Sequence, residues 1–150
     1  MNKSHIIKNL RQAKLDHIEW IKQGHKLVKG LPQEQIIKPE DCAACAYSKW
    51  YKEEGFKLVD IPQLKALEAL HNDIHNNYTA LYYITFDRRK KARATLITGG
   101  VELPIDETPF RQKKLKELEK KTVNMIRALS TIEKKVDAMK DQDFENGWLI

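Results

Sequence analysis

The chain of 150 residues carries a formal net charge of +6, and 41% of its residues are hydrophobic while 32% are charged. This length is typical of one domain, which can bury roughly two-thirds of the surface that its unfolded chain exposes. No apolar run approaches the roughly 18 residues of a membrane span, and the N-terminal residues lack the pattern of a signal peptide. We therefore expect a cytoplasmic protein outside the membrane. In that reducing compartment its two cysteines indicate metal or redox chemistry over a structural disulfide.

The positive charge raises the question of a nucleic-acid partner. Most Lys and Arg residues alternate with Glu and Asp, a pattern typical of solvated helix faces, so we predict no nucleic-acid binding. One exception is the compact basic cluster Arg88-Arg89-Lys90-Lys91, which Arg93 extends. We interpret it as a solvated helix end, with an acidic partner or an anionic surface as the alternative.

A first helix is predicted up to Gly30 and Pro32, two residues of the kind that end helices. Its apolar positions recur at intervals of three and four, and they are Leu10, Ala13, His17, Trp20 or Ile21, Gly24 and Leu27. His17 therefore lies within the stripe that faces the core.

Two further helices are predicted in the middle of the chain. A short one starts near Pro39-Glu40-Asp41, where the proline and the acids suit a helix N-terminus, and ends near Gly55. A long one follows Asp60-Ile61-Pro62, with Asp60 as its N-cap, and continues to about Ile97. Its apolar stripe comprises Leu64, Leu67, His71, Ile74 or His75, Tyr78, and Leu81 or Tyr82. A small hairpin over residues 95–103 is the alternative at its end.

After a linker at residues 99–109, the last helix has the most regular pattern. Its apolar positions are Leu115, Leu118, Thr122, Met125, Leu129, Ile132, Val136 and Met139. This period of about 3.5 is the seam of an antiparallel bundle or of a dimer. We predict an all-α fold, a four-helix bundle with a short Cys-bearing helix. It forms a single domain over residues 1–140. The tail at 141–150 is interpreted as a frayed end, and the alternative is that its apolar residues dock onto a partner or onto the end of the bundle.

Four residues at core positions of these helices are potential metal ligands: His17, Cys45, His71 and His75. His71 and His75 are four apart, so both imidazoles lie on one helix face and can reach a single ion. Three imidazoles and one thiolate suit zinc, which takes nitrogen and sulfur ligands in tetrahedral geometry. Taken singly, each has a simpler explanation as a hydrogen-bonded core histidine or a small buried cysteine. Taken together, they would leave several imidazoles unsatisfied in an apolar interior unless a metal were bound.

The same residues occur in a recognisable order. HxxW at His17–Trp20 is followed by a cysteine with a Trp-Tyr pair at residues 45–51, and then by HxxxH at His71–His75. The tryptophan of HxxW and the cysteine are separated by 24 residues, and Trp50 and His71 by 20. This arrangement resembles the chemoreceptor zinc-binding (CZB) domain of bacterial signalling proteins, from about Ile6 to about Phe86. The chain departs from the family pattern after the cysteine, where Tyr47 and Ser48 replace an aliphatic residue and a glycine.

The resemblance implies a zinc site formed by His17, Cys45, His71 and His75, in a protein that is typically a homodimer. Members of this family are appended to chemoreceptors and diguanylate cyclases, and their zinc-thiolate is associated with sensing zinc availability or oxidants such as hypochlorous acid. We therefore predict a non-enzymatic sensory module that acts through a signalling partner of the chemoreceptor or diguanylate cyclase kind.

Two alternatives are kept beside this function. The main one is a purely structural zinc in a helical protein-interaction module, and a less favoured one is a di-iron bundle of the hemerythrin type, in which a cysteine is out of place. A zinc hydrolase is not favoured, because no HExxH motif occurs and the nearby acids Glu19 and Asp73 belong to other helix faces.

Three residues are expected around the site. Trp20 and Trp50 are predicted to pack around the ligands. Cys42, three residues before Cys45, is interpreted as a small, partly buried side chain, with a resolving thiol for an oxidised Cys45 as the alternative. The remaining histidines, His5 and His25, are predicted to lie on the surface.

Overall fold

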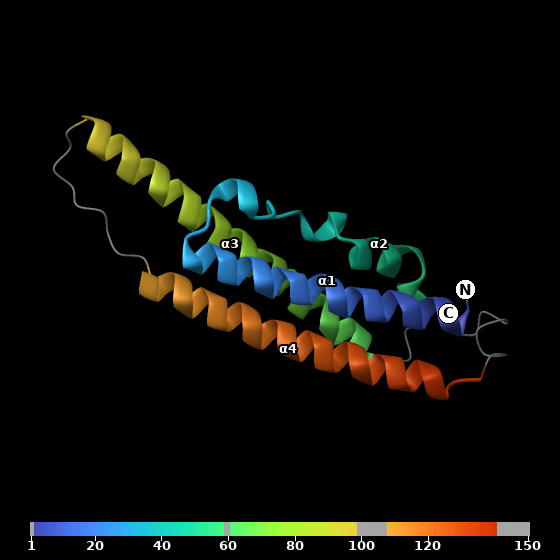
Figure 1. Cartoon of the computed structure of the whole chain (residues 1–150). Coiled ribbons are helices and arrows are strands. Elements are labelled where there is room, and N and C mark those ends of the chain that lie inside the picture. The colour runs from blue at the N-terminus through green and yellow to red at the C-terminus, as the bar shows by residue number, and fades with distance from the viewer. Residues whose placement is uncertain (1, 59–60, 99–107, 141–150) are drawn as a thin grey trace.

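The chain folds into a bundle of helices (Figure 1). The structure is a computed structural model, and it describes residues 2–58, 61–98 and 108–140. Its α-helices are α1 (Lys3–Lys29), α2 (Ala46–Glu53), α3 (Pro62–Thr98) and α4 (Thr108–Ala138), and three short 3-10 turns are η1 (Gln33–Gln35), η2 (Cys42–Ala44) and η3 (Gly55–Lys57). No strand occurs in these ranges, so the predicted all-α bundle is confirmed.

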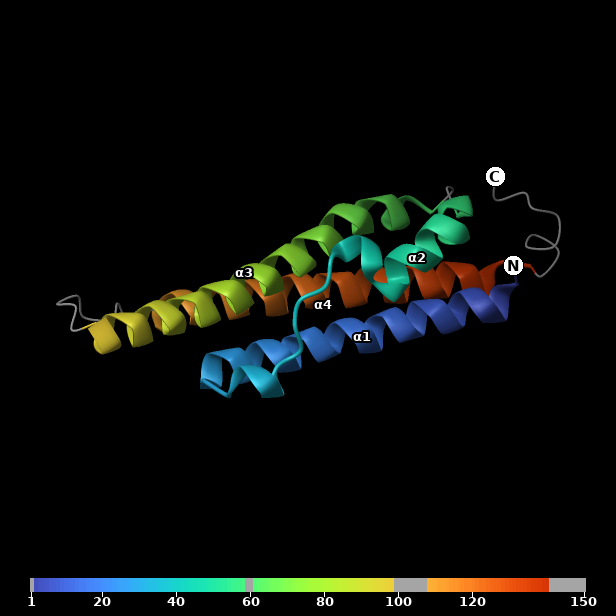
Figure 2. The ribbon, with the colours of Figure 1, turned by 90° about the horizontal axis from the view of Figure 1, so that it is seen from above.

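The three long helices form the body of the bundle, and α4 packs along both α1 and α3. Seen from above, the segment that connects α1 to α3 runs over these two helices and carries α2 (Figure 2). This segment contacts α1 through α2 and contacts α3 through η2. A short helix on one side and α4 on the other therefore enclose the space between α1 and α3.

The regular apolar seam of α4 is buried within the chain itself. Leu118, Met125, Leu129 and Ile132 are all fully buried against the other helices. At Gly24 of α1, a Cβ would lie only 2.9 Å from Leu115 Cδ1, so the two helices approach closely at this glycine. The pattern fits a seam between helices or between subunits, and the family resemblance favoured packing between subunits. The structure corrects this expectation, because the seam is buried between helices of one chain.

The ends of α1 follow its local sequence. Asn2 caps the N-terminus by accepting a hydrogen bond from the His5 amide at 2.8 Å. Gly30 ends the helix with a φ of 83°, in the left-handed region that favours glycine. The predicted end of the first helix is therefore confirmed.

The short helix differs from its prediction. It begins at Ala46, not near Pro39, and Cys45 precedes it with an extended backbone at φ −63° and ψ 141°. Asp41 instead caps the 3-10 turn η2, because its carboxylate accepts a hydrogen bond from the Ala43 amide at 3.1 Å. Residues before this turn are held by side chains far along the chain: the Ile37 amide donates to Gln23, and its carbonyl accepts from Tyr78. The acidic residues that suggested a longer helix therefore cap a shorter turn.

The favoured interpretation of the end of α3 is confirmed, since residues 95–98 are helical and α3 ends at Thr98. The remainder of the alternative hairpin, the N-cap at Asp60 and the tail at 141–150 lie outside the described residues. The side chains of the basic cluster at residues 88–93 also lie outside the described part of the structure. Among the described residues, no helix is both long enough and apolar enough to span a membrane.

Candidate metal centre

The four predicted ligands come together at one point between α1, α2 and α3. Their potential ligand atoms, one from each residue, all lie within 4.8 Å of one another. His17 comes from the middle of α1, His71 and His75 come from successive turns of α3, and Cys45 immediately precedes α2. All four are buried, with exposed fractions of 0%, 3%, 6% and 3% for His17, His71, His75 and Cys45.

The spacing of the ligand atoms can be compared with a tetrahedral site. Tetrahedral zinc with ordinary bond lengths places two nitrogens about 3.3 Å apart and a nitrogen and a sulfur about 3.6 Å apart. The two α3 imidazoles have their Nε2 atoms 3.1 Å apart. Cys45 Sγ lies 3.5 Å from His71 Nε2 and 3.9 Å from His17 Nε2. These three distances are close to tetrahedral spacing, and the donor set, three nitrogens and one sulfur, has the composition of a zinc site.

Outer hydrogen bonds orient the imidazoles toward this point. His17 Nδ1 donates to the Ala13 carbonyl at 2.7 Å, which leaves Nε2 with its lone pair directed at the cluster. His75 hydrogen-bonds to the Glu40 backbone carbonyl. His71 Nδ1 lies 3.4 Å from Cys42 Sγ. Metal-binding histidines generally use their second nitrogen in this way, and the contact fixes which nitrogen is free to bind.

Burial keeps the imidazoles neutral at physiological pH. It lowers the pKa of His17 to about 4, an effect that the hydrogen bond to Ala13 only partly opposes. It also lowers the pKa of His71 to about 3, and the neighbouring His17 and His75 lower it further. The pKa of His75 is lowered by burial as well. Neutral imidazoles are the form that binds a metal ion.

For the Cys45 thiol, in contrast, burial disfavours the charged form, which is the form that binds a metal. Burial raises its pKa, and the nearby backbone amides of Ser48 and Tyr47 only partly oppose this rise. A buried thiolate requires a compensating positive charge. Since none of the three imidazoles is charged at neutral pH, a bound cation is the group that would stabilise the thiolate here.

Aromatic side chains surround the cluster. The Trp20 ring lies 6.0 Å from the His75 ring and 4.6 Å from the Tyr78 ring. Tyr47 packs edge-on against His71, with ring centroids 4.9 Å apart. Trp50 contacts Tyr47 at 5.8 Å, so it supports the site one layer further out. These tryptophans thus lie around the ligands.

Four contacts to the ligands were not predicted: those of the Ala13 and Glu40 carbonyls, of the Tyr47 ring and of the Cys42 sulfur. The position of Ala13, four residues before His17, gives the helical spacing at which such a hydrogen bond forms, so that contact has a sequence signal. Glu40 has no such signal, because its carbonyl is brought to His75 by the path of an irregular segment.

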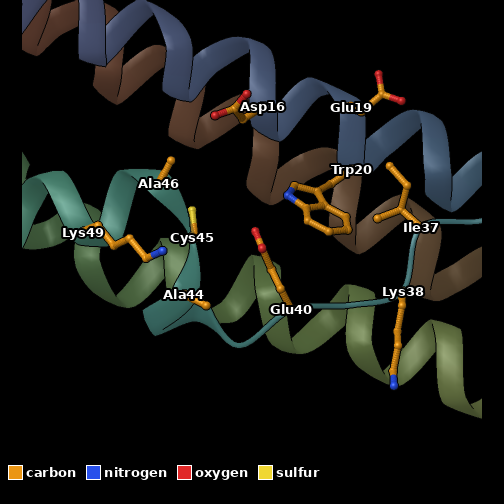
Figure 3. Close-up of a pocket in the computed structure, with 10 residues that line it drawn as sticks. All are labelled: Asp16, Glu19, Trp20, Ile37, Lys38, Glu40, Ala44, Cys45, Ala46 and Lys49. Atoms are coloured by element: carbon orange, nitrogen blue, oxygen red, sulfur yellow. The ribbon is translucent and has the colours of Figure 1, made fainter.

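A surface cavity of about 460 Å³ reaches the cysteine from the α1 side. It is lined by residues of α1, of the connecting segment and of the start of α2 (Figure 3). Trp20 and Glu40 point into this space beside Cys45 (Figure 3). A small molecule in this cavity would therefore lie next to the buried cysteine.

No carboxylate belongs to the ligand cluster among the described residues. The side chain of Asp73 is 56% exposed and lies 3.9 Å from Lys121, and that of Glu19 is 46% exposed and lies near Lys22. His5 and His25 lie on the surface, where they pair with Glu54 and Glu119. These positions agree with the sequence predictions.

Fold and site together define a helical bundle with a buried group of three histidines and one cysteine able to hold a metal ion. Residues 17–82 match the model of the chemoreceptor zinc-binding domain family. The match begins at His17 and includes all four ligand residues, so the resemblance indicated by the sequence motifs is confirmed over these residues. No curated protein and no solved structure gives a significant match.

Proposed function

We propose that the chain is a cytoplasmic sensory or regulatory module without enzymatic activity, in which His17, Cys45, His71 and His75 bind one zinc ion. The observation that carries this proposal is the convergence of four buried ligand atoms within 4.8 Å. The ion would supply the positive charge that a buried thiolate needs and would occupy the free lone pairs of three neutral imidazoles.

Zinc is preferred over other metals because of the donor set. One sulfur and three nitrogens are a donor set typical of zinc, whereas magnesium and calcium require oxygen ligands. A di-iron site of the hemerythrin type needs bridging carboxylates, and no carboxylate belongs to this cluster in the described ranges. Four protein ligands also close the coordination shell, which favours a structural or sensory ion over a catalytic one.

The sensing part of the proposal rests on Cys45. It is the only ligand that two-electron oxidation converts into a poor ligand, and it precedes a helix of eight residues. Hypochlorous acid, which the adjacent cavity can admit, would react with the thiol to give a sulfenic acid and hydrogen chloride. Three imidazoles on two long helices would remain in place, while the short segment around α2 would lose its attachment. Such a short element is the one most easily released.

Zinc binding itself is tested by elemental analysis of protein purified without chelators. We expect one zinc per protomer, because one chain supplies all four ligands. Cys45→Ala and His71→Ala should bind zinc far more weakly, whereas His25→Ala, at a half-exposed histidine outside the cluster, should bind it normally. Full zinc retention in both ligand variants would eliminate this site.

Hydrogen exchange distinguishes a sensor from a structural zinc. After oxidation of Cys45, or after zinc removal, we expect faster exchange confined to about residues 38–56, while α1, α3 and α4 stay protected. Unchanged protection there, with Cys45 shown by mass spectrometry to be oxidised, would favour the purely structural alternative.

The proposal includes assembly and partners. We expect a homodimer and a signalling partner of the chemoreceptor or diguanylate cyclase kind, on the basis of the family. Because the seam of α4 is buried within the chain, the dimer must use another surface. Sedimentation at tens of micromolar should show a dimer, and a monomer there would contradict this part.

A further inference from the structure

Cys42 occupies a specific position beside the metal centre. Its Sγ lies 3.4 Å from His71 Nδ1, and on the other side of the same ring Cys45 Sγ lies 3.5 Å from His71 Nε2. The two sulfurs therefore stand at the two nitrogens of one imidazole. Only the sulfur of Cys45 belongs to the ligand cluster.

The hydrogen-bond partners of the three histidines differ in kind. His17 and His75 use backbone carbonyls, of Ala13 and Glu40, which no side-chain substitution removes. His71 uses a side chain, Cys42. When Nε2 of His71 binds a metal, its Nδ1 must carry a proton, and the atom next to that proton is the Cys42 sulfur. Cys42 is thus the replaceable acceptor of the site.

We infer that Cys42 is a positioning residue that sets zinc affinity by accepting a hydrogen bond from His71 Nδ1. This inference rests on the proposed zinc site. It assigns Cys42 a role different from that of a resolving thiol, because its sulfur contacts the outer nitrogen of a ligand histidine. Removal of the histidine's outer partner typically weakens metal binding by about 10- to 100-fold.

The surroundings of Cys42 predict how different substitutions rank. A surface cavity of about 620 Å³ is lined by Cys42, Ser48 and His71, so water can enter where the sulfur is removed. In Cys42→Ala such a water can accept from Nδ1, and the loss should be near the lower limit, about 10-fold. Cys42→Val fills the space without an acceptor, so its loss should approach about 100-fold. Cys42→Ser retains an acceptor and should recover most of the affinity.

Ser48 provides the matched control. Its hydroxyl lies 3.8 Å from Cys42 Sγ, and this contact does not involve His71. Ser48→Ala therefore changes the packing around Cys42 but leaves the acceptor for Nδ1 in place. Its zinc affinity should stay near that of the unchanged protein.

The test measures zinc affinity by competition with a chromophoric chelator, together with the exchange rate of the His71 Nδ1 proton in zinc-loaded protein by nitrogen-15 NMR. We expect zinc affinity to decrease in the order wild type, Cys42→Ser, Cys42→Ala and Cys42→Val. We also expect the Nδ1 proton to exchange faster in Cys42→Ala than in wild type. The free energy of unfolding of the metal-free variants shows whether folding has changed.

Each result decides the inference separately from the zinc site. If the unchanged protein binds no zinc, the proposed function is wrong. If it binds zinc and Cys42→Val binds it equally well, or if Ser48→Ala loses as much affinity as Cys42→Ala, zinc binding stands and the role of Cys42 is wrong.

Discussion

The metal centre and the seam of α4 are both buried, yet they are stabilised in different ways. At the seam, apolar side chains such as Leu129 and Met125 are fully buried against other apolar groups. At the metal centre, three imidazoles and a thiol are buried, and burial opposes the charged form of each. Apolar burial stabilises the fold with or without a bound ligand, whereas the polar cluster depends on its ligand. The bundle thus has an apolar core that needs no ligand and a buried polar cluster that needs one.

The greatest change is expected in zinc affinity, from a variant that alters the metal centre and leaves the seam intact. His17→Leu removes a fully buried ligand and replaces it with an apolar side chain of similar size. Zinc affinity should fall by at least about 100-fold, since one of four ligands is lost. The metal-free variant should be no less stable than metal-free wild type, because a buried polar group has been replaced by an apolar one. Chelator competition measures zinc affinity, and urea unfolding measures stability. A metal-free variant that is less stable than metal-free wild type would contradict the comparison.

Leu129→Ala is the corresponding variant in the seam of α4. This residue is fully buried, and truncation leaves a cavity in the apolar core. We expect a loss of about 2–5 kcal/mol in the free energy of unfolding, with or without zinc. Zinc affinity of the folded variant should be nearly unchanged. Val123→Ala, on the same helix but 41% exposed, is the control and should have little effect on unfolding.

Acidification should affect the metal centre next. In the metal-free protein the pKa values of His17 and His71 are lowered to about 4 and about 3 from 6.5. Below pH 6.5 the unfolded chain therefore binds protons that the folded chain does not, and stability falls as pH decreases. Between pH 7.5 and 5.5 we expect a loss of about 1 kcal/mol for each of these histidines. Urea unfolding with a chelator present measures it, and metal-free His17→Leu should show a shallower slope. Identical slopes would mean that His17 is not kept neutral by burial.

The smallest effect is expected at the surface of the α1–α4 contact. Glu133 accepts from Arg11 and from Lys14, each at 2.6 Å, and the Lys14 hydrogen bond is the main cause that lowers the pKa of its carboxyl. The stabilisation of the fold by these two contacts is therefore present above the ordinary pKa of glutamate, and it is lost as pH falls below that value. Glu133→Gln should change the free energy of unfolding by only about 0–1 kcal/mol at pH 7. High salt should reduce even that difference, and a salt-independent loss of several kcal/mol would show a packing role instead.

Much of the site was predictable from the sequence because ligand type and helical period are local properties. His71 and His75 lie on one face of α3 because four residues make about one helical turn. His17 faces the core because it continues the stripe of Leu10 and Ala13. The family match over residues 17–82 agrees with the same motifs. The start of α2 was predicted wrongly, because the acids at Glu40 and Asp41 suit the N-terminus of an α-helix as well as that of a 3-10 turn.

The all-α class, the buried face of each long helix and the residue types able to bind a metal all follow from the amino-acid sequence. Periodicity is fixed by backbone geometry within each helix, so it is independent of how the helices pack. Three features required the packed fold: the burial of the α4 seam within one chain, the position of Cys45 just before its helix and the contact of Cys42 with Nδ1 of His71. The seam depends on how α4 packs along α1 and α3. The two cysteine positions depend on how the segment between α1 and α3 crosses the bundle, and that path is set by contacts between residues far apart in sequence, such as Gln23 with Ile37 and Ile37 with Tyr78.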